Sequence, residues 1–149
     1  MSCQYCEKGA DLLQKMIPIC TYRNADIYLF RDQTHKGKCI VAYRNHKTEW
    51  YELDETERKD FITAVAATAK VVQELFHADK INYATYGDLL SHLHVHVTPK
   101  YSNGPDWGGP FRDDRPATVL REEEYAERVQ QIREGLQNTD QLPEGRPEI

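Results

Sequence analysis

Three histidines at alternate positions, His92, His94 and His96, constrain this chain more than any other feature of its sequence. Successive side chains of a β-strand point to opposite faces, so a strand here would place all three imidazoles in one row. The apolar residues between them, such as Leu93 and Val95, would face the other way and pack into a core. We therefore expect the histidine face of this strand to form the wall of a site.

The histidine row allows three interpretations. It could be the polar face of an ordinary strand, but three imidazoles on one face are costly to bury and repel one another when protonated. Imidazole nitrogens bind metal ions, and alternate residues of one strand can bind a single ion together. Imidazole is also a nucleophile, and one histidine could attack phosphorus while its neighbours control the geometry. The residues alone leave the metal centre and the nucleophile open.

Composition and charge limit the class of protein. A length of 149 residues, 40% of them hydrophobic and 29% charged, fits one compact domain. The formal charge of −5 argues against general binding to nucleic-acid backbones, yet it allows a local basic pocket for a nucleotide phosphate. No apolar run is long enough to cross a bilayer, and the N-terminus lacks the features of a signal peptide. We expect a cytoplasmic protein that binds neither membranes nor nucleic acid.

Four cysteines in a chain without an export signal are more typical of reduced thiols or metal ligands than of a disulfide framework. Cys3 and Cys6 form a C-x-x-C pair, which by itself could be half of a zinc site, a redox dithiol or a chance pair. A redox pair needs a preceding strand, and only two residues precede Cys3. A zinc site would need two further ligands. Cys20 and Cys39 fall in apolar strand patterns and are expected in the core.

Turn residues and apolar periodicity predict the remaining elements. Short connections between three early strands favour an antiparallel meander. The longest helix should begin at Asp54, with Glu57 in the capping-box position. The expected ranges are helices at 10–16, 54–77 and 119–137, strands at 17–22, 26–31, 38–43 and 80–86, a tight connection at 87–88 before the histidine strand, and a frayed end at 141–149.

The segment His-Leu-His-Val-His-Val-Thr at 92–98, preceded by Asn82 and Gly87, resembles the signature of the histidine triad superfamily. The resemblance covers about 3–111. It implies an α+β fold, with an antiparallel sheet of about five strands and one long and one short helix packed on it, usually in a homodimer. We expect a histidine triad domain at 1–112, and a C-terminal helix and frayed tail at 113–149 as part of the same single domain.

The family resemblance also implies an activity. Members are nucleotide hydrolases or transferases whose middle histidine attacks the α-phosphate, giving a nucleotidyl-histidine intermediate that water cleaves. By that resemblance His94 is the nucleophile, His96 contacts a phosphoryl oxygen or passes a proton to the leaving group, and His92 supports the row. We expect hydrolysis of a dinucleoside polyphosphate or a nucleoside phosphoramidate. The alternatives are a nucleotidyltransferase, a zinc-stabilised nucleotide-binding module with little turnover, and a metal hydrolase that uses all three histidines.

Further positions match the substrate contacts of the family. Asp32 would hold the ribose, because a carboxylate accepts both hydrogen bonds of a vicinal diol. Asn82 would donate to phosphate, and the Gly87–Asp88 connection would bring backbone N–H groups to it. Asp88 stands where relatives often have glutamine, and Lys38 where many have a histidine. These departures leave the substrate open, and any role of that histidine is absent or assumed by Lys38.

Zinc ligands are also implied by the resemblance. In zinc-containing members a C-x-x-C pair near the start joins a histidine after an early strand and the first histidine of the triad. The matching residues here are Cys3, Cys6, His46 and His92. Two thiolates and two imidazoles are a suitable tetrahedral set for Zn²⁺, and such a closed site would be structural.

Two segments after the histidine strand suggest surfaces that pack on something. The glycine- and proline-rich loop at 101–112 contains Trp107 and Phe111, which could contact a partner subunit or a base. The apolar stripe of the last helix, from Tyr125 to Leu136, should dock on the body or on a second subunit.

Overall fold

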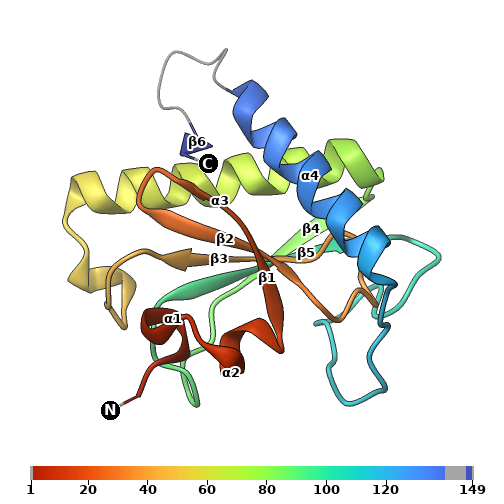
Figure 1. Cartoon of the computed structure of the whole chain (residues 1–149), viewed down its shortest axis with the longest axis horizontal. Coiled ribbons are helices and arrows are strands. Elements are labelled where there is room, and N and C mark those ends of the chain that lie inside the picture. Colours follow the sequence, from red (N-terminus) through yellow and green to blue (C-terminus); the bar gives the residue numbers. More distant parts are fainter. Residues whose placement is uncertain (1, 140–146, 149) are drawn as a thin grey trace.

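A central antiparallel sheet organises the structure, which is a computed structural model that describes residues 2–139 and 147–148. Its strand order is β4-β5-β3-β2-β1-β6, and every neighbouring pair is antiparallel (Figure 1). The expected α+β fold with about five strands is confirmed. The strands are β1 (Met16–Tyr22), β2 (Ala25–Phe30), β3 (Cys39–Tyr43), β4 (Lys80–Ala84), β5 (His94–Lys100) and β6 (Pro147–Glu148).

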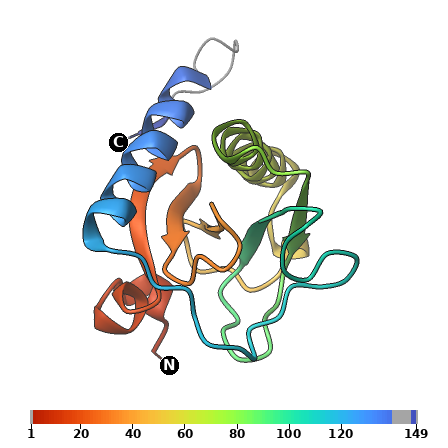
Figure 2. The ribbon, with the colours of Figure 1, turned by 90° about the vertical axis from the view of Figure 1, so that its right-hand side faces the viewer.

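Helices cover both faces of this sheet (Figures 1 and 2). The long helix α3 and the C-terminal helix α4 cross one face, and the two short N-terminal helices lie against the other. Their bounds are α1 (Gln4–Glu7), α2 (Ala10–Leu13), the 3-10 turn η1 (Trp50–Glu52), α3 (Glu55–Phe76) and α4 (Glu122–Asn138). Within the described ranges, no helix combines the length and apolar character needed to cross a membrane.

Local sequence signals explain where α3 begins. The Asp54 carboxylate accepts from the backbone N–H of Glu57, and the Glu57 carboxylate accepts from the backbone N–H of Asp54. This reciprocal pair satisfies two N–H groups that a helix start would leave unbonded. The expected capping box is therefore present. The preceding turn η1 was not expected, because three residues give too short a pattern to recognise.

The apolar row of β5 packs into the main core, as expected from the alternation. Leu93, Val95 and Val97 are buried together with Phe61 of α3 and Ile132 of α4. The even-numbered residues of β5 face the other way, where a smaller cluster lies under the N-terminal helices. That cluster comprises Tyr5, Leu12, Met16, Tyr28, Ile40 and Ala42.

Two boundaries around the histidines differ from the sequence expectation. β5 begins at His94, so His92 lies two residues before its first residue, outside the strand, and the His92 carbonyl accepts a hydrogen bond from the His94 ring. β4 ends at Ala84, and 85–93 form an irregular connection with mostly exposed side chains, where we expected a longer strand and a tight turn. This longer connection lets the chain cross from β4 to the end of β3, where Leu93 N–H donates to the Lys47 carbonyl.

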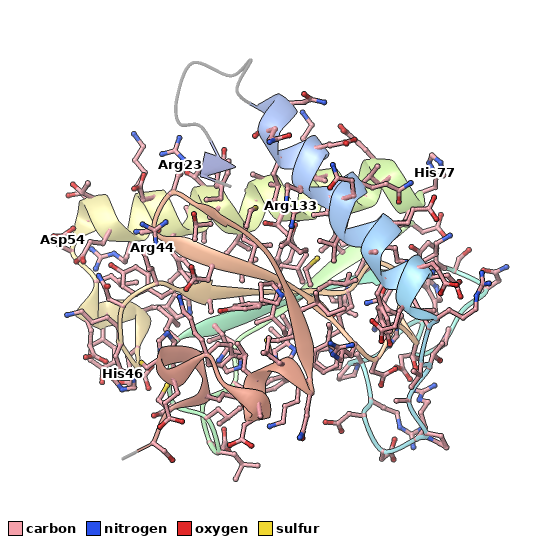
Figure 3. All side chains as sticks on the ribbon, viewed as in Figure 1. Arg23, Arg44, His46, Asp54, His77 and Arg133 are labelled. Atoms are coloured by element: carbon pink, nitrogen blue, oxygen red, sulfur yellow. The ribbon has the colours of Figure 1, made fainter. Side chains whose placement is uncertain are left out.

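The C-terminal helix docks on the body of the same chain. Ile132 and Leu136 are completely buried in the core that also contains α3. The Tyr125 hydroxyl donates to the Arg31 carbonyl at 2.6 Å, and Arg133 Nε, which points from α4 toward the sheet in Figure 3, donates to the Ile19 carbonyl at 3.0 Å. The frayed end expected at 141–149 falls largely on residues outside the described ones, 141–146 and 149, but Pro147–Glu148 pairs with β1.

The single-domain expectation predicts that α4 and the sheet unfold together. Leu136→Ala should lower the free energy of unfolding by about 3 kcal/mol, because it opens a cavity in the shared core. Val119→Ala, at a side chain that is 75% exposed, should change it by less than about 0.5 kcal/mol. Urea unfolding followed by circular dichroism would measure both. A separate early transition for α4 would contradict the single domain.

Candidate active site and metal centre

The three imidazoles lie side by side on one face of the sheet. On β3, Ala42 pairs with His94 and Ile40 pairs with His96, so small or apolar side chains flank the row. The ring centroids of His94 and His96 are 5.4 Å apart. The Tyr5 ring of α1 lies 5.2 Å from His92 and 5.0 Å from His94, and it covers the end of the row nearest the N-terminus.

A backbone hydrogen bond determines which His94 nitrogen can react. Nδ1 lies 2.6 Å from the carbonyl oxygen of His92, and a carbonyl only accepts, so Nδ1 bears the hydrogen and Nε2 the lone pair. Burial lowers the pKa of His94 below its ordinary value, although the bond to His92 acts to raise it. The ring is therefore neutral at neutral pH, with a nucleophilic Nε2.

The pKa of His96 is also lowered, and His96 is therefore neutral too. Burial, the charge of Lys38 and the neighbouring His94 together lower its pKa to about 3. Aromatic rings of Phe30, Tyr86 and Phe111 lie 5.2–6.4 Å from its centroid. Its Nδ1 is buried and has no hydrogen-bond partner in the described part of the chain.

Cys3, Cys6, His46 and His92 meet at one end of the row, with their ligand atoms all within 4.8 Å of one another. His46 Nδ1 lies 3.3 Å from His92 Nδ1, and the sulfurs of Cys3 and Cys6 lie 3.4 and 3.6 Å from His92 Nδ1. Tetrahedral zinc geometry requires about 3.3 Å between two nitrogen ligands and about 3.6 Å between nitrogen and sulfur. The four side chains therefore fit one zinc-sized ion.

Local structure holds these ligands in place. Cys3 is the N-cap residue of α1 and Cys6 lies three residues later in its first turn, where Cys6 N–H donates to the Cys3 carbonyl, and Figure 3 shows His46 beside this helix. His92 Nε2 donates to the Tyr43 carbonyl at 2.7 Å, which leaves Nδ1 free of hydrogen and directed at the cysteines. A backbone acceptor on the far nitrogen is the usual way to orient a metal-binding imidazole.

The expected substrate residues lie in different places. Asn82 pairs with Thr98 on the same face as the histidines, and it lines a cavity of about 410 Å³ with Lys80, Lys100 and Trp107. Gly87 is exposed, and a Cβ there would meet nothing within 4 Å. Asp88 instead borders the metal-ligand end.

Asp32 is partly engaged by its own loop. Its Oδ1 accepts from Thr34 N–H, Thr34 O–H and Thr118 N–H. Burial acts to raise the pKa of Asp32, but these hydrogen bonds and the charge of Lys38 lower it below its ordinary value. Asp32 is therefore ionised at neutral pH, and only Oδ1 is engaged by the described residues.

Sequence reasoning did not recognise what holds the aromatic loop. The side chain of Asp106 is buried and its backbone has a positive φ of 63°. Its carboxylate accepts from His35 Nε2 at 2.9 Å, Arg112 N–H at 3.0 Å and the Arg115 guanidinium. These contacts fold 101–115 along the side of the sheet where α1 and α2 lie (Figure 2). Phe111 thereby reaches His96, while Trp107 remains 48% exposed. In the sequence, the Pro-Asp-Trp-Gly segment was the only signal that could have indicated this role of Asp106.

Comparison with known proteins agrees with this fold. Residues 18–103 match the model of the HIT domain family, which is more than half of the chain. The chain belongs to the HIT domain family, and the resemblance in its sequence is confirmed. Membership supports a function of the nucleotide-binding or nucleotide-hydrolysing kind.

Individual relatives are distant. Protein hit of Bacillus subtilis strain 168 is 24% identical over 98 residues, which are 61% of this chain and 68% of that protein. A crystal structure of a histidine triad protein from Sinorhizobium meliloti 1021 is 26% identical, with a TM-score of 0.78 over 85% of this chain and 93% of that one. A zinc-bound histidine triad family protein from Mycobacterium smegmatis is 19% identical, with a TM-score of 0.62 over 95% and 97%.

Proposed function

We propose that this protein is a nucleotidyl hydrolase that cleaves at the α-phosphate of a dinucleoside polyphosphate or a nucleoside phosphoramidate. One observation supports this most directly: His94 is buried and neutral, and its Nδ1 is bonded to the His92 carbonyl at 2.6 Å. That arrangement is what a histidine nucleophile needs, because the positive charge that develops on attack is stabilised by the carbonyl on the other nitrogen.

The proposed reaction has two steps. The Nε2 lone pair of His94 attacks the α-phosphorus, and the bond to the leaving group breaks with its electron pair on the leaving atom. Water then attacks the phosphorus, releases the nucleotide and returns His94 to its neutral form with one proton passed to solvent. His96, neutral and adjacent, would hydrogen-bond a phosphoryl oxygen during both steps.

The remaining substrate contacts are proposed from their positions. Asn82 lies on the face of the histidine row, where its amide would donate to phosphate. Asp32 would accept from the ribose hydroxyls through the oxygen that its loop leaves unbonded. Gly87 and Asp88 are exposed on the connection before His92, where their backbone N–H groups would approach the phosphate when substrate binds.

The nucleophile proposal predicts a covalent adduct on one histidine. Incubation with diadenosine tetraphosphate or an adenosine phosphoramidate, followed by rapid acid quench and mass spectrometry, should show AMP on His94. His94→Asn should abolish the adduct and lower kcat by at least about 10⁴-fold, since no other group can replace the nucleophile. His77→Asn, at an exposed histidine after α3, should change neither.

Three results would change this proposal. Turnover by His94→Asn at the wild-type rate would exclude His94 as the nucleophile. Nucleotide binding by the wild-type protein without adduct or product would favour a zinc-stabilised binding module. Transfer of AMP to an added phosphate acceptor, faster than to water, would favour a nucleotidyltransferase.

We also propose that Cys3, Cys6, His46 and His92 bind a structural Zn²⁺. The support is the donor set, two thiols and two imidazoles, with separations that match tetrahedral geometry. When bound, the ion would complete a closed site that ties α1 to the end of the histidine row. It would leave no open position for substrate.

Zinc removal should therefore affect stability more than chemistry. Native mass spectrometry should show one zinc per chain, lost in the Cys3→Ser, Cys6→Ser double variant, and that variant should have a lower Tm because α1 is no longer anchored. Cys20→Ser, outside the cluster, should retain the metal. Equal metal content in the double variant would exclude this ligand set. Loss of turnover with normal stability on chelation, and no adduct on His94, would favour a metal hydrolase.

A homodimer is the third proposal, and the open edge of the sheet supports it. β4 is the last strand on its side, and beside it Tyr83 and Ile62 are 56% and 55% exposed. These side chains border an apolar cavity of about 330 Å³ with Trp50 and Val65. Exposed apolar side chains beside a free strand edge are typical of an interface.

Sedimentation velocity would test the dimer. The wild-type protein should sediment at twice the chain mass of 17.3 kDa, and Ile62→Glu should sediment as a monomer because a carboxylate would be buried in the interface. Leu89→Glu, at a side chain that is 97% exposed and borders the cysteine–histidine cluster, should remain dimeric. A dimeric Ile62→Glu variant would place the interface elsewhere.

A further inference from the structure

Lys38 is an unusual residue for the interior of a protein. Its side chain is only 4% exposed, and its ammonium lies 4.5 Å from the ring centroid of Phe30 and 3.7 Å from that of Phe111. Cation–π contacts of this kind hold an ammonium in position but accept none of its hydrogens. Among the described residues, the contacts of Lys38 Nζ are with these two rings, so its N–H donors remain available for a ligand.

The second buried lysine of the same region shows the contrast. Lys100 is 2% exposed, and its Nζ donates to the backbone carbonyls of Asp106, at 2.8 Å, and Gly109. The Lys100 ammonium is thus hydrogen-bonded to backbone carbonyls of the loop after β5. Burial of a charge costs free energy unless the charge is hydrogen-bonded, and in the part of the chain that the structure describes Lys38 has nearby carboxylates but no backbone carbonyls like those that accept from Lys100.

Two more unpartnered polar atoms lie next to Lys38 on the sheet. Thr98 Oγ1 and His96 Nδ1 are buried and have no hydrogen-bond partner within the described chain. The β3–β5 register pairs Cys39 with Val97 and Ile40 with His96, so its continuation places Lys38 opposite Thr98, on the face of the histidine row. Asn82 pairs with Thr98 from the other side. Each of these side chains can donate a hydrogen bond.

We propose that Lys38, Thr98 and His96 form an oxyanion subsite that binds phosphate oxygens of the substrate, with the Lys38 ammonium as its positive charge. This inference rests on the hydrolase proposed above and adds the group that neutralises the phosphate. His96 stays neutral and can offer only a neutral N–H. Phe111, which lies over both Lys38 and His96, keeps water away, and the attraction between the ammonium and a phosphate is stronger there.

The subsite should lose its charge in mild alkali. Burial lowers the pKa of Lys38 to about 8, although nearby carboxylates act to raise it. Lys38 is therefore charged below this pH and neutral above it, so phosphate binding should weaken as the pH rises from 7 to 10. A nucleotide monophosphate remains a dianion over this range, because its second pKa is about 6. The charged or titratable groups around Lys38 are Asp32, His35, His96, Asp106 and Asp113.

Isothermal titration with AMP and with adenosine would test the subsite. Lys38→Met, which keeps the length of the side chain, should weaken AMP binding at pH 7 by at least about 10-fold and lower kcat/KM by about 100-fold. Its adenosine binding should stay unchanged, because adenosine has no phosphate. Lys38→Arg should retain most of the affinity and remove the loss between pH 7 and 10. Lys36→Met, an equal change of charge at an exposed side chain two residues away, should behave as wild type.

The outcomes separate this inference from the hydrolase proposal. Equal AMP affinity in Lys38→Met and wild type would overturn the subsite, even if the His94 adduct forms. A Lys38-dependent AMP affinity without any adduct would support the subsite and overturn the hydrolase. Loss of adenosine binding in a Lys38→Met protein with a wild-type Tm would show that Lys38 acts through Asp32 on the ribose, and would also overturn the subsite. Thr98→Val gives an independent check, since it should weaken AMP binding without altering the pH dependence.

Discussion

His92 connects the candidate active site at His94 with the cysteine–histidine cluster, through its backbone carbonyl and its two ring nitrogens. Its carbonyl accepts from His94 Nδ1 and so leaves the His94 Nε2 lone pair available. Its ring Nε2 donates to the Tyr43 carbonyl, which turns Nδ1 toward Cys3 and Cys6. Any shift of His92 would therefore disturb the tautomer of His94 and the geometry of the cysteine–histidine cluster together. The proposed zinc would hold the His92 side chain in position without taking part in the reaction.

The position of His92 depends in turn on the register of β5. Leu93, Val95 and Val97 are buried against α3 and α4, and each contributes roughly 1.5–3 kcal/mol of hydrophobic stabilisation. A slip of one residue would turn this apolar row toward the site face and the histidines toward the main core, so the packing of the core holds the site face in place. The polar face is consequently free to carry side chains that would be costly elsewhere, including three neutral imidazoles and the Lys38 ammonium.

Three separate segments of the chain complete this face. The β2–β3 connection supplies Asp32 and Lys38, and the loop after β5 supplies Phe111, held by the buried carboxylate of Asp106. Thr118 bonds to Asp32 just before α4, so the C-terminal helix and the candidate ribose residue are linked. The segment beyond the family match thus contributes to the site by positioning Asp32, although it contains none of the proposed catalytic residues.

The sequence by itself determined the family, the antiparallel sheet that the family implies, and the separation of an apolar face from a histidine face. These features depend on the alternation of side chains along a strand, which is a local property. It also named Cys3, Cys6, His46 and His92 as one ligand set through the family pattern, and their side chains do meet. Only the tertiary structure decided what depends on distant contacts. The contact of Asp106 with His35 and the burial of Lys38 between two aromatic rings arise from residues about seventy positions apart in the chain, and no local pattern encodes them.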